Sequence, residues 1–251
     1  MNVTTAPRTV RLVAVSGGLG SPSSTRLLAE RIISHADRAL QAHGISAEIT
    51  VIELRDLAGQ IANNLVTGYA EPDLAEALRD VRGADGLIAV TPVFNASFAG
   101  LFKSFFDLLT PADLEGTPVV LGATGGSARH SLVVEHALRP LFAYLRALPM
   151  PTGIFVATAD WGAAAPGEAE SDGVEGRAAR VARELASAMS VGVDGPVADR
   201  AHLSLVTVEV PTIAATTSDF TAEARVAAER RAEHSEFADL MAKYAATEGI
   251  E

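Results

Sequence analysis

Short apolar runs alternate along the chain with longer segments of helical periodicity. Most of the runs are almost continuously apolar, as strands buried on both faces of a parallel sheet are. The expected strands are Val10–Val15, Ala47–Ile52, Gly86–Thr91, Pro118–Ala123 and Gly153–Ala157. The expected helices between them are Ser24–Ala42, Leu74–Val81, Phe98–Leu109 and Leu132–Leu148. Strands separated by helices of this length form βαβ units, so the pattern predicts an α/β fold with a five-stranded parallel sheet between two layers of helices.

Five such strands are typical of the flavodoxin-like, three-layer arrangement, whose ligands lie beyond the carboxyl ends of the strands. In the first helix, apolar residues recur every four positions, and Ser23 or Ser24 can cap its start. The segment Phe98–Leu109 has almost no polar face, so it must be covered both by the sheet and by something else. A second subunit in a two-fold dimer is the simplest cover. The alternative is the C-terminal extension of the same chain.

The chain is expected to divide into a flavodoxin-like domain over residues 9–190 and a C-terminal extension over residues 191–251. A helix over Glu175–Ser190 closes the first part. In the extension, Ser204–Val210 alternates apolar and polar residues, which suits an edge strand or an exchanged arm. Asp219–Tyr244 has the pattern of a helix with a short apolar stripe.

Composition excludes several classes of function. The 251 residues include no cysteine, which rules out disulfides, thiolate catalysis, thiolate-ligated zinc and iron–sulfur clusters. The 20 basic and 31 acidic residues give a net charge of −11, which argues against a nucleic-acid-binding surface. The six histidines show no metal-ligand spacing. Without a long apolar run or a secretory signal, the chain is expected to be a soluble cytoplasmic protein with no membrane span.

The loop after the first strand, Ser16–Arg26, has the features of a phosphate site. Its glycines allow a sharp turn, and hydroxyl side chains crowd the start of the next helix, where free N–H groups and the helix dipole favour an anion. Arg26 can add a charge. The loop lacks the Gly-Lys-Ser/Thr ending of the P-loop and the third glycine of the dinucleotide fingerprint. A capped helix after a flexible turn is the alternative interpretation.

The loop after the third strand, Thr91–Ser97, leads into the apolar helix. Pro92 stiffens the loop, Asn95 offers both donors and acceptors, and Ser97 can cap the helix. Phe94 is either a wall against an aromatic ring or an ordinary core residue.

The loop after the fourth strand, Thr124–His130, can approach a flat heterocycle because its paired glycines free the backbone. Thr124 and Ser127 can donate hydrogen bonds to the carbonyls of such a ring. Arg129 and His130 add positive charge, which suits a reduced anionic ring or a second, phosphate-bearing ligand. A salt bridge between Arg129 and Glu135 is the alternative.

Taken together, the hydroxyl-rich loop, the segment TPVFNASFAGLFKSFFDLL and the segment ATGGSARHSL resemble the NADPH-dependent FMN reductase family over about residues 9–158. The similarity is greatest to the actinobacterial reductases that supply reduced flavin to luciferase-like monooxygenases. The resemblance implies a flavodoxin-like fold, noncovalently bound FMN, and NADPH or NADH as reductant. Hydride would pass from the nicotinamide to flavin N5, with no catalytic acid, base or metal required.

The resemblance also implies which residues contact the flavin. The expected phosphate ligands are Ser16, Ser21, Ser23, Ser24 and Thr25. The expected contacts to the ribityl chain and ring are Pro92, Val93, Phe94 and Asn95. The isoalloxazine edge is expected to meet Thr124, Gly125, Gly126 and Ser127. The chain departs from the family in lacking an arginine early in the first loop and in having Phe94 where a tyrosine is common.

Three alternatives to a flavin reductase remain open. One is an FMN-dependent quinone or azo reductase on the same fold, which the sequence does not separate from an FMN reductase. Another is a flavodoxin-like electron carrier, although carriers usually hold FMN between aromatic residues of two loops, and here only Phe94 and Trp161 are available. The third is a non-enzymatic module that docks a partner through its long tail.

Overall fold

The strands form one sheet whose spatial order is β2-β1-β3-β5-β6, with β4 paired to β3 and β7 paired to β5. The computed structural model describes residues 8–161 and 173–191. The strands are β1 (Arg8–Ser16), β2 (Ile45–Glu53), β3 (Gly86–Phe94), β4 (Ser97–Phe98), β5 (Pro118–Gly125), β6 (Leu148–Pro149) and β7 (Ile154–Ala157). All five predicted strands are present, and the flavodoxin-like α/β fold is confirmed. The described sheet has seven strands rather than five because β4 and β6, of two residues each, carry no recognisable sequence pattern.

The helices are α1 (Ser24–Ala42), α2 (Ala58–Thr67), α3 (Pro72–Arg82), α4 (Gly100–Phe106), α5 (Arg139–Tyr144) and α6 (Val174–Val191). Short helical turns are η1 (Leu54–Leu57), η2 (Ala128–His130), η3 (Val134–Leu138, a π-helical turn) and η4 (Thr158–Trp161). The bounds of α1 agree with the prediction. The helix predicted over residues 132–148 is divided into η3 and α5. It ends at Tyr144 because the backbone turns at Arg146 (φ 57°) before it enters β6.

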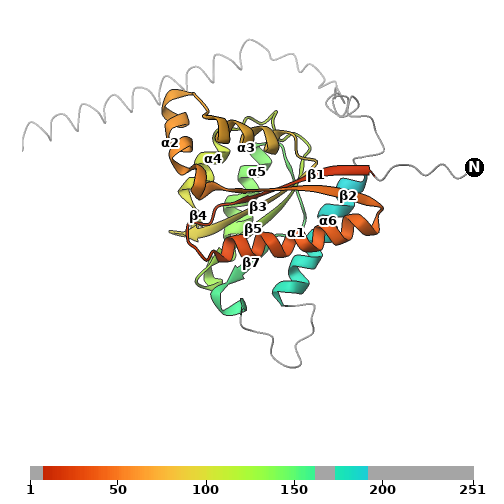
Figure 1. The fold of residues 1–251 in the computed structure, drawn as a ribbon. Coiled ribbons are helices and arrows are strands. Elements are labelled where there is room, and N and C mark those ends of the chain that lie inside the picture. Colours follow the sequence, from red (N-terminus) through yellow and green to blue (C-terminus); the bar gives the residue numbers. More distant parts are fainter. Residues whose placement is uncertain (1–7, 162–172, 192–251) are drawn as a thin grey trace, which may run out of the picture. The chain divides into compact units, whose positions relative to one another are not determined.

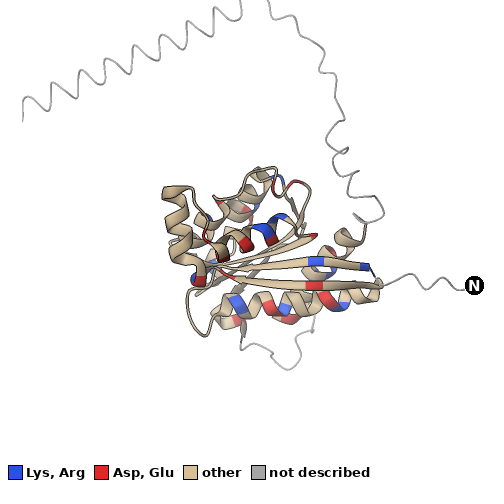
Figure 2. Cartoon of the chain, turned by 45° about the horizontal axis from the view of Figure 1, so that its top comes forward, with Lys and Arg blue, Asp and Glu red and all other residues tan. Residues whose placement is uncertain are grey.

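The helices cover the sheet in two layers, α1 and α6 on one face and α2 to α5 on the other (Figure 1). Leu28, Ile32 and Leu185 lie in the core on the first face, and each is fully buried. Charged residues of both signs occur along α1, whereas β3 and β5 carry none (Figure 2). The three-layer arrangement therefore follows from the apolar strands and the amphipathic outer helices.

The apolar helix α4 is shorter than expected and is largely covered by its own chain. Phe98 belongs to β4, while Phe102, Phe105 and Phe106 are at most 1% exposed. The ring of Phe106 lies 4.7 Å from that of Phe102 and 4.8 Å from that of Phe142 in α5, measured between centroids. Residues of η1 and α2, two elements absent from the prediction, pack in the same cluster. Burial of this helix therefore does not by itself require a second subunit.

The helix expected over Glu175–Ser190 is confirmed as α6. The edge strand expected over Ser204–Val210 and the helix over Asp219–Tyr244 lie outside the described residues, so the boundary between domain and extension stays a prediction. Within residues 8–161 and 173–191, no helix is both long and apolar enough to cross a bilayer. Among the same residues, no group of three or more His, Asp or Glu side chains is placed so that it could hold a metal ion.

Candidate functional site

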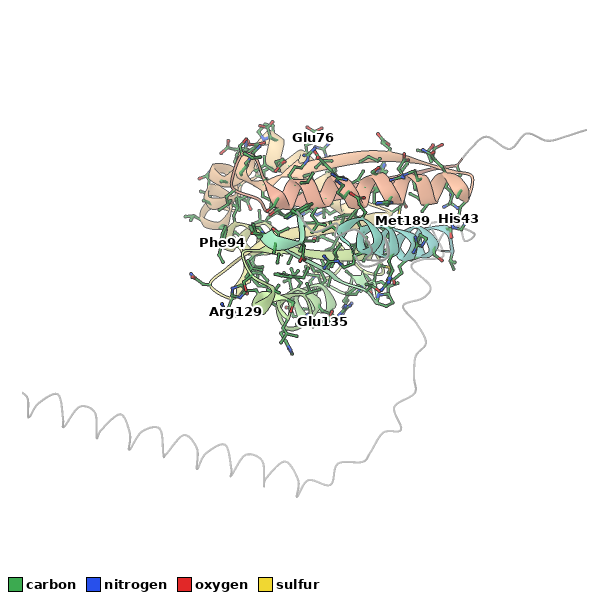
Figure 3. The ribbon with its side chains drawn as sticks, turned by 90° about the horizontal axis from the view of Figure 1, so that it is seen from below. His43, Glu76, Phe94, Arg129, Glu135 and Met189 are labelled. Atoms are coloured by element: carbon green, nitrogen blue, oxygen red, sulfur yellow. The ribbon has the colours of Figure 1, made fainter. Side chains whose placement is uncertain are left out.

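The three loops singled out in the sequence lie at one edge of the sheet. Strands β1, β3 and β5 are adjacent and parallel, with Ser16 opposite Val90 and Pro92 opposite Thr124, so their carboxyl ends meet. Figure 3 shows Phe94 and Arg129 at one end of the molecule, with His43 and Met189 at the other. This edge is where a doubly wound fold places its ligand.

The phosphate loop, defined here as residues 16–25, is tightly folded at its start. Ser16 is fully buried, and its hydroxyl oxygen has no hydrogen-bond partner in the part of the chain that the structure describes. The Gly17 N–H donates to the Val90 carbonyl at 2.8 Å. A Cβ at Gly18 would lie 2.1 Å from Ser23 Oγ and 3.1 Å from Thr25 Cβ, so any larger residue here would displace the Ser23 hydroxyl. The loop thus forms a cradle with an orphaned hydroxyl at its base, a feature that fits a bound anion.

The start of α1 completes this cradle. Ser23 is the N-cap, because its hydroxyl accepts a hydrogen bond from the Arg26 N–H at 3.2 Å. The N–H groups of Ser24 and Thr25 lie in the first helical turn, where the helix itself offers no acceptor. Ser21 and Ser24 are exposed. Hydroxyls and free N–H groups at a helix N-terminus form a fitting site for a phosphate.

A buried hydrogen bond connects the first loop to the third. The hydroxyl oxygens of Thr25 and Thr124 lie 2.8 Å apart, and the two residues are 2% and 3% exposed. A hydroxyl has one donor and two acceptor positions, so each threonine keeps two positions for further partners. The bond fixes the start of α1 against the end of β5. The phosphate and ring ends of the predicted site are thereby held in register.

Arg26, a predicted source of positive charge, is occupied by two carboxylates. Its guanidinium contacts Glu30 at 2.8 Å and Glu53 at 3.1 Å. Although burial opposes it, these two carboxylates raise the pKa of Arg26 above its usual value. A different arginine contacts the loop: Arg55 donates from Nη1 to the Gly20 carbonyl at 2.8 Å. Sequence reasoning missed Arg55, because this contact spans 35 residues and depends on the path of the loop.

The second loop is a β-hairpin. Phe94 pairs with Ser97 across a two-residue turn in which Asn95 and Ala96 have φ angles of 50° and 66°, as tight hairpin turns require. Phe94 is 48% exposed, so the alternative that it is an ordinary core residue is wrong. Ser97 does not cap α4, whose N-cap is Ala99 with no side-chain hydrogen bond.

The third loop leaves open space beside the hairpin. A Cβ at Gly125 would lie 3.0 Å from the Phe155 ring, whereas a Cβ at Gly126 would meet no atom within 4 Å. Ser127 accepts a long hydrogen bond of 3.4 Å from the Arg129 N–H. The backbone at Gly126 is therefore accessible to a flat ligand.

Arg129 and His130 are exposed beside this loop. Glu135, the alternative partner of Arg129, instead binds Arg139 through two hydrogen bonds of 2.6 and 2.9 Å. Hydrogen bonding from Arg139 lowers the pKa of Glu135. The Arg129–Glu135 salt bridge that was the alternative is thus replaced by one between Glu135 of η3 and Arg139 of α5.

A second arginine that sequence reasoning missed holds the strand beside the third loop. Arg177 of α6 donates to the Phe155 carbonyl at 2.7 Å and to Asp160 at 2.9 Å. Asp160 in turn accepts from the Ala157 N–H at 3.1 Å. These bonds hold the end of β7, which pairs with β5 up to Gly125. Trp161 packs on the core face formed by α1 and α6.

Comparison with known proteins agrees with this geometry. Residues 10–162 match the family model described as NADPH-dependent FMN reductase. The FMN reductase (NADPH) of Pseudomonas aeruginosa is 38% identical over 151 residues, covering 60% of this chain and 78% of that protein. The NADH-dependent FMN reductase SfnE of Pseudomonas putida is 40% identical over 151 residues, with the same coverage of 60% and 78%. A solved oxidoreductase from Corynebacterium diphtheriae has a TM-score of 0.67 and 42% identity, covering 74% of this chain and 98% of that one.

Proposed function

The chain belongs to the NADPH-dependent FMN reductase family, and we propose that the loops after β1, β3 and β5 form its flavin site. It is an oxidoreductase that reduces FMN with NADPH or NADH. FMN, when bound, supplies the redox chemistry, because its ring accepts a hydride from the nicotinamide. The protein residues bind and orient the two nucleotides.

The observation that carries the site assignment is the cradle of the phosphate loop. The phosphate is held by Ser16, Ser21, Ser23, Ser24 and Thr25. In the folded chain the Ser16 hydroxyl is buried without a partner, and Gly18 packs against Ser23. Ser23 uses one acceptor position for the Arg26 N–H, so its proton remains available for the phosphate.

The other two loops hold the ribityl chain and the ring. The ribityl chain and one side of the ring contact Pro92, Val93, Phe94 and Asn95. The isoalloxazine edge contacts Thr124, Gly125, Gly126 and Ser127. The exposed ring of Phe94 and the open space at Gly126 support this placement. Backbone N–H groups near Gly126 then stabilise negative charge at the edge of the ring.

The reduced flavin is released to a partner monooxygenase in the cytoplasm, where NAD(P)H is available. Each of the three loops has exposed residues, among them Gly20, Phe94 and Gly126, which supports exchange of FMN with solvent. Bacterial luciferase, which emits light only when it receives reduced FMN, serves as a reporter of this release. Light from a mixture of the reductase, FMN, NADPH and luciferase is expected. NADPH oxidation without light would contradict release.

A homodimer completes the proposal, with a second copy covering the groove between α4 and α5. This groove of about 840 Å³ is lined mainly by apolar side chains, among them Phe98, Leu109 and Leu141, with Lys103 and Asp107 also in its lining. Tyr144 on its rim is 74% exposed. An exposed aromatic residue beside an apolar groove is typical of a protein interface.

The assay that tests the activity follows NADPH and NADH oxidation at 340 nm. Oxidation in air that depends on added FMN is expected. A quinone added without oxygen tests the alternative acceptor, and faster turnover with quinone than with FMN would favour a quinone reductase. Flavin binding without nucleotide oxidation would contradict the reductase and indicate an electron carrier.

A further inference from the structure

Glu53, the last residue of β2, and Arg55, in the turn η1 that follows it, make hydrogen bonds at the phosphate loop and at the start of α1. Arg55 donates from Nη1 to the Gly20 carbonyl at 2.8 Å. Glu53 accepts from Arg26 Nη1 at 3.1 Å, at the point where the loop enters α1. Both contacts join segments far apart in sequence. The segment from Glu53 to Arg55 therefore bonds to the loop at Gly20 and to Arg26, the residue directly after the loop.

The Arg55 contact determines the direction of one peptide group. The peptide between Gly20 and Ser21 is planar and trans, so its carbonyl and its N–H point in opposite directions. With the Gly20 carbonyl directed at Arg55, the Ser21 N–H must face away from Arg55. Glycine at position 20 would allow this peptide to rotate with little steric cost. Arg55 is thus the side chain that selects one of its orientations.

The direction of this peptide matters for an anion. A carbonyl oxygen turned into the cradle would repel a phosphate, whereas an N–H turned into it donates a hydrogen bond. Arg26 is paired with Glu30 and Glu53, so its charge is largely compensated. Arg55 is one-third exposed, and its other ionic contact, to the exposed Asp56, is long at 3.6 Å.

We propose that Arg55 is a positioning residue for the flavin phosphate, which orients the Gly20–Ser21 peptide so that the site prefers FMN to riboflavin. The proposal rests on the flavin site described above and extends it to a residue outside the three loops. Arg55 acts through the loop rather than on the ring. Its loss should therefore change the use of phosphorylated flavin alone.

The test compares FMN with riboflavin, which has the same ring without the phosphate. Arg55→Gln removes the guanidinium and shortens the side chain by two bonds, so its amide no longer reaches the Gly20 carbonyl. Arg38→Gln is the matched control, because among the described residues Arg38 bonds only to Ser34 and His35 of its own helix. In NADPH oxidation, Arg55→Gln is expected to raise the KM for FMN about tenfold, with kcat at saturating FMN unchanged. The KM for riboflavin should not change. Arg38→Gln should leave both KM values as in the wild type.

Arg55→Lys provides a second measurement if the Gln variant fails to fold. A lysine can donate to one carbonyl but has a shorter reach. Its preference for FMN over riboflavin should therefore be lower than that of the wild type, but by less than tenfold. An unchanged preference in either folded variant, or an equal loss with both flavins, would overturn the proposal. A wild-type protein that oxidises no NADPH with either flavin would instead overturn the proposed function itself.

Discussion

The buried hydrogen bond between Thr25 and Thr124 allows a quantitative test of how the loops are joined. Its oxygen atoms are 2.8 Å apart, and both residues are at most 3% exposed. Thr124→Val preserves the shape of the side chain but leaves the Thr25 hydroxyl without this partner. An unsatisfied buried hydroxyl costs about 1–3 kcal/mol, so we expect the free energy of unfolding to fall by about 2 kcal/mol. Urea unfolding of the flavin-free protein measures it.

The double variant Thr25→Val/Thr124→Val separates this hydrogen bond from general packing. Because both hydroxyls are then replaced by methyl groups, its loss of stability should be smaller than the sum of the two single losses by about 1 kcal/mol or more. Thr9→Val, at an exposed position of β1, is the control and should change stability by less than about 0.5 kcal/mol. Strictly additive single losses would refute the reasoning.

Three further predictions concern the cap, a carboxylate and the interface. Ser24→Ala should raise the Kd for FMN about tenfold without loss of stability. Ser23→Ala should raise the Kd in the same way and should also cost about 1 kcal/mol of stability, because it removes the N-cap of α1. Fluorescence titration measures the Kd, and urea melts measure the stability. Hydrogen bonding from His35 and the nearby cationic groups lower the pKa of Glu175 from its usual value. The ionised carboxylate therefore stabilises the fold at higher pH, and this contribution is lost as the pH falls through the lowered pKa. Because this side chain is half-exposed, Glu175→Gln should cost about 0.5 kcal/mol at about pH 6. In urea melts at successively lower pH this cost should shrink as the carboxylate becomes protonated, and a cost that stays constant would contradict this. Tyr144→Asp should convert the proposed dimer to a monomer in light scattering, and a monomeric wild type would contradict the interface.

The sequence was sufficient for the main strands and for α1. Continuous apolar residues predicted β3 and β5, and a cap at Ser23 or Ser24 together with four-residue apolar spacing and Gly44 predicted α1. The three loops at the ligand edge followed from strand order, since adjacent parallel strands end at the same edge. These features depend on local pattern, which a single sequence displays.

Features that depend on tertiary contact were not predictable. Helix α2 buries only Ile61 completely among its residues and shows too short an apolar pattern to recognise. Because α2 was missed, the apolar helix α4 was expected to need another cover. The contact of Arg55 with Gly20 depends on the folded path of a glycine-rich loop. The pairing of Glu135 with Arg139 is a different case: it is a local contact between residues four apart, and it was missed because only Arg129 was considered as a partner of Glu135.

The most direct test of the central claim compares the wild type with Gly18→Ala in FMN-dependent NADPH oxidation at 340 nm. The added Cβ would lie 2.1 Å from Ser23 Oγ, so it must disturb the cradle that we assign to the FMN phosphate. We predict rapid FMN-dependent oxidation by the wild type and a KM for FMN raised at least about tenfold in the folded variant. A folded Gly18→Ala protein with the wild-type KM for FMN would contradict the assignment of the flavin site.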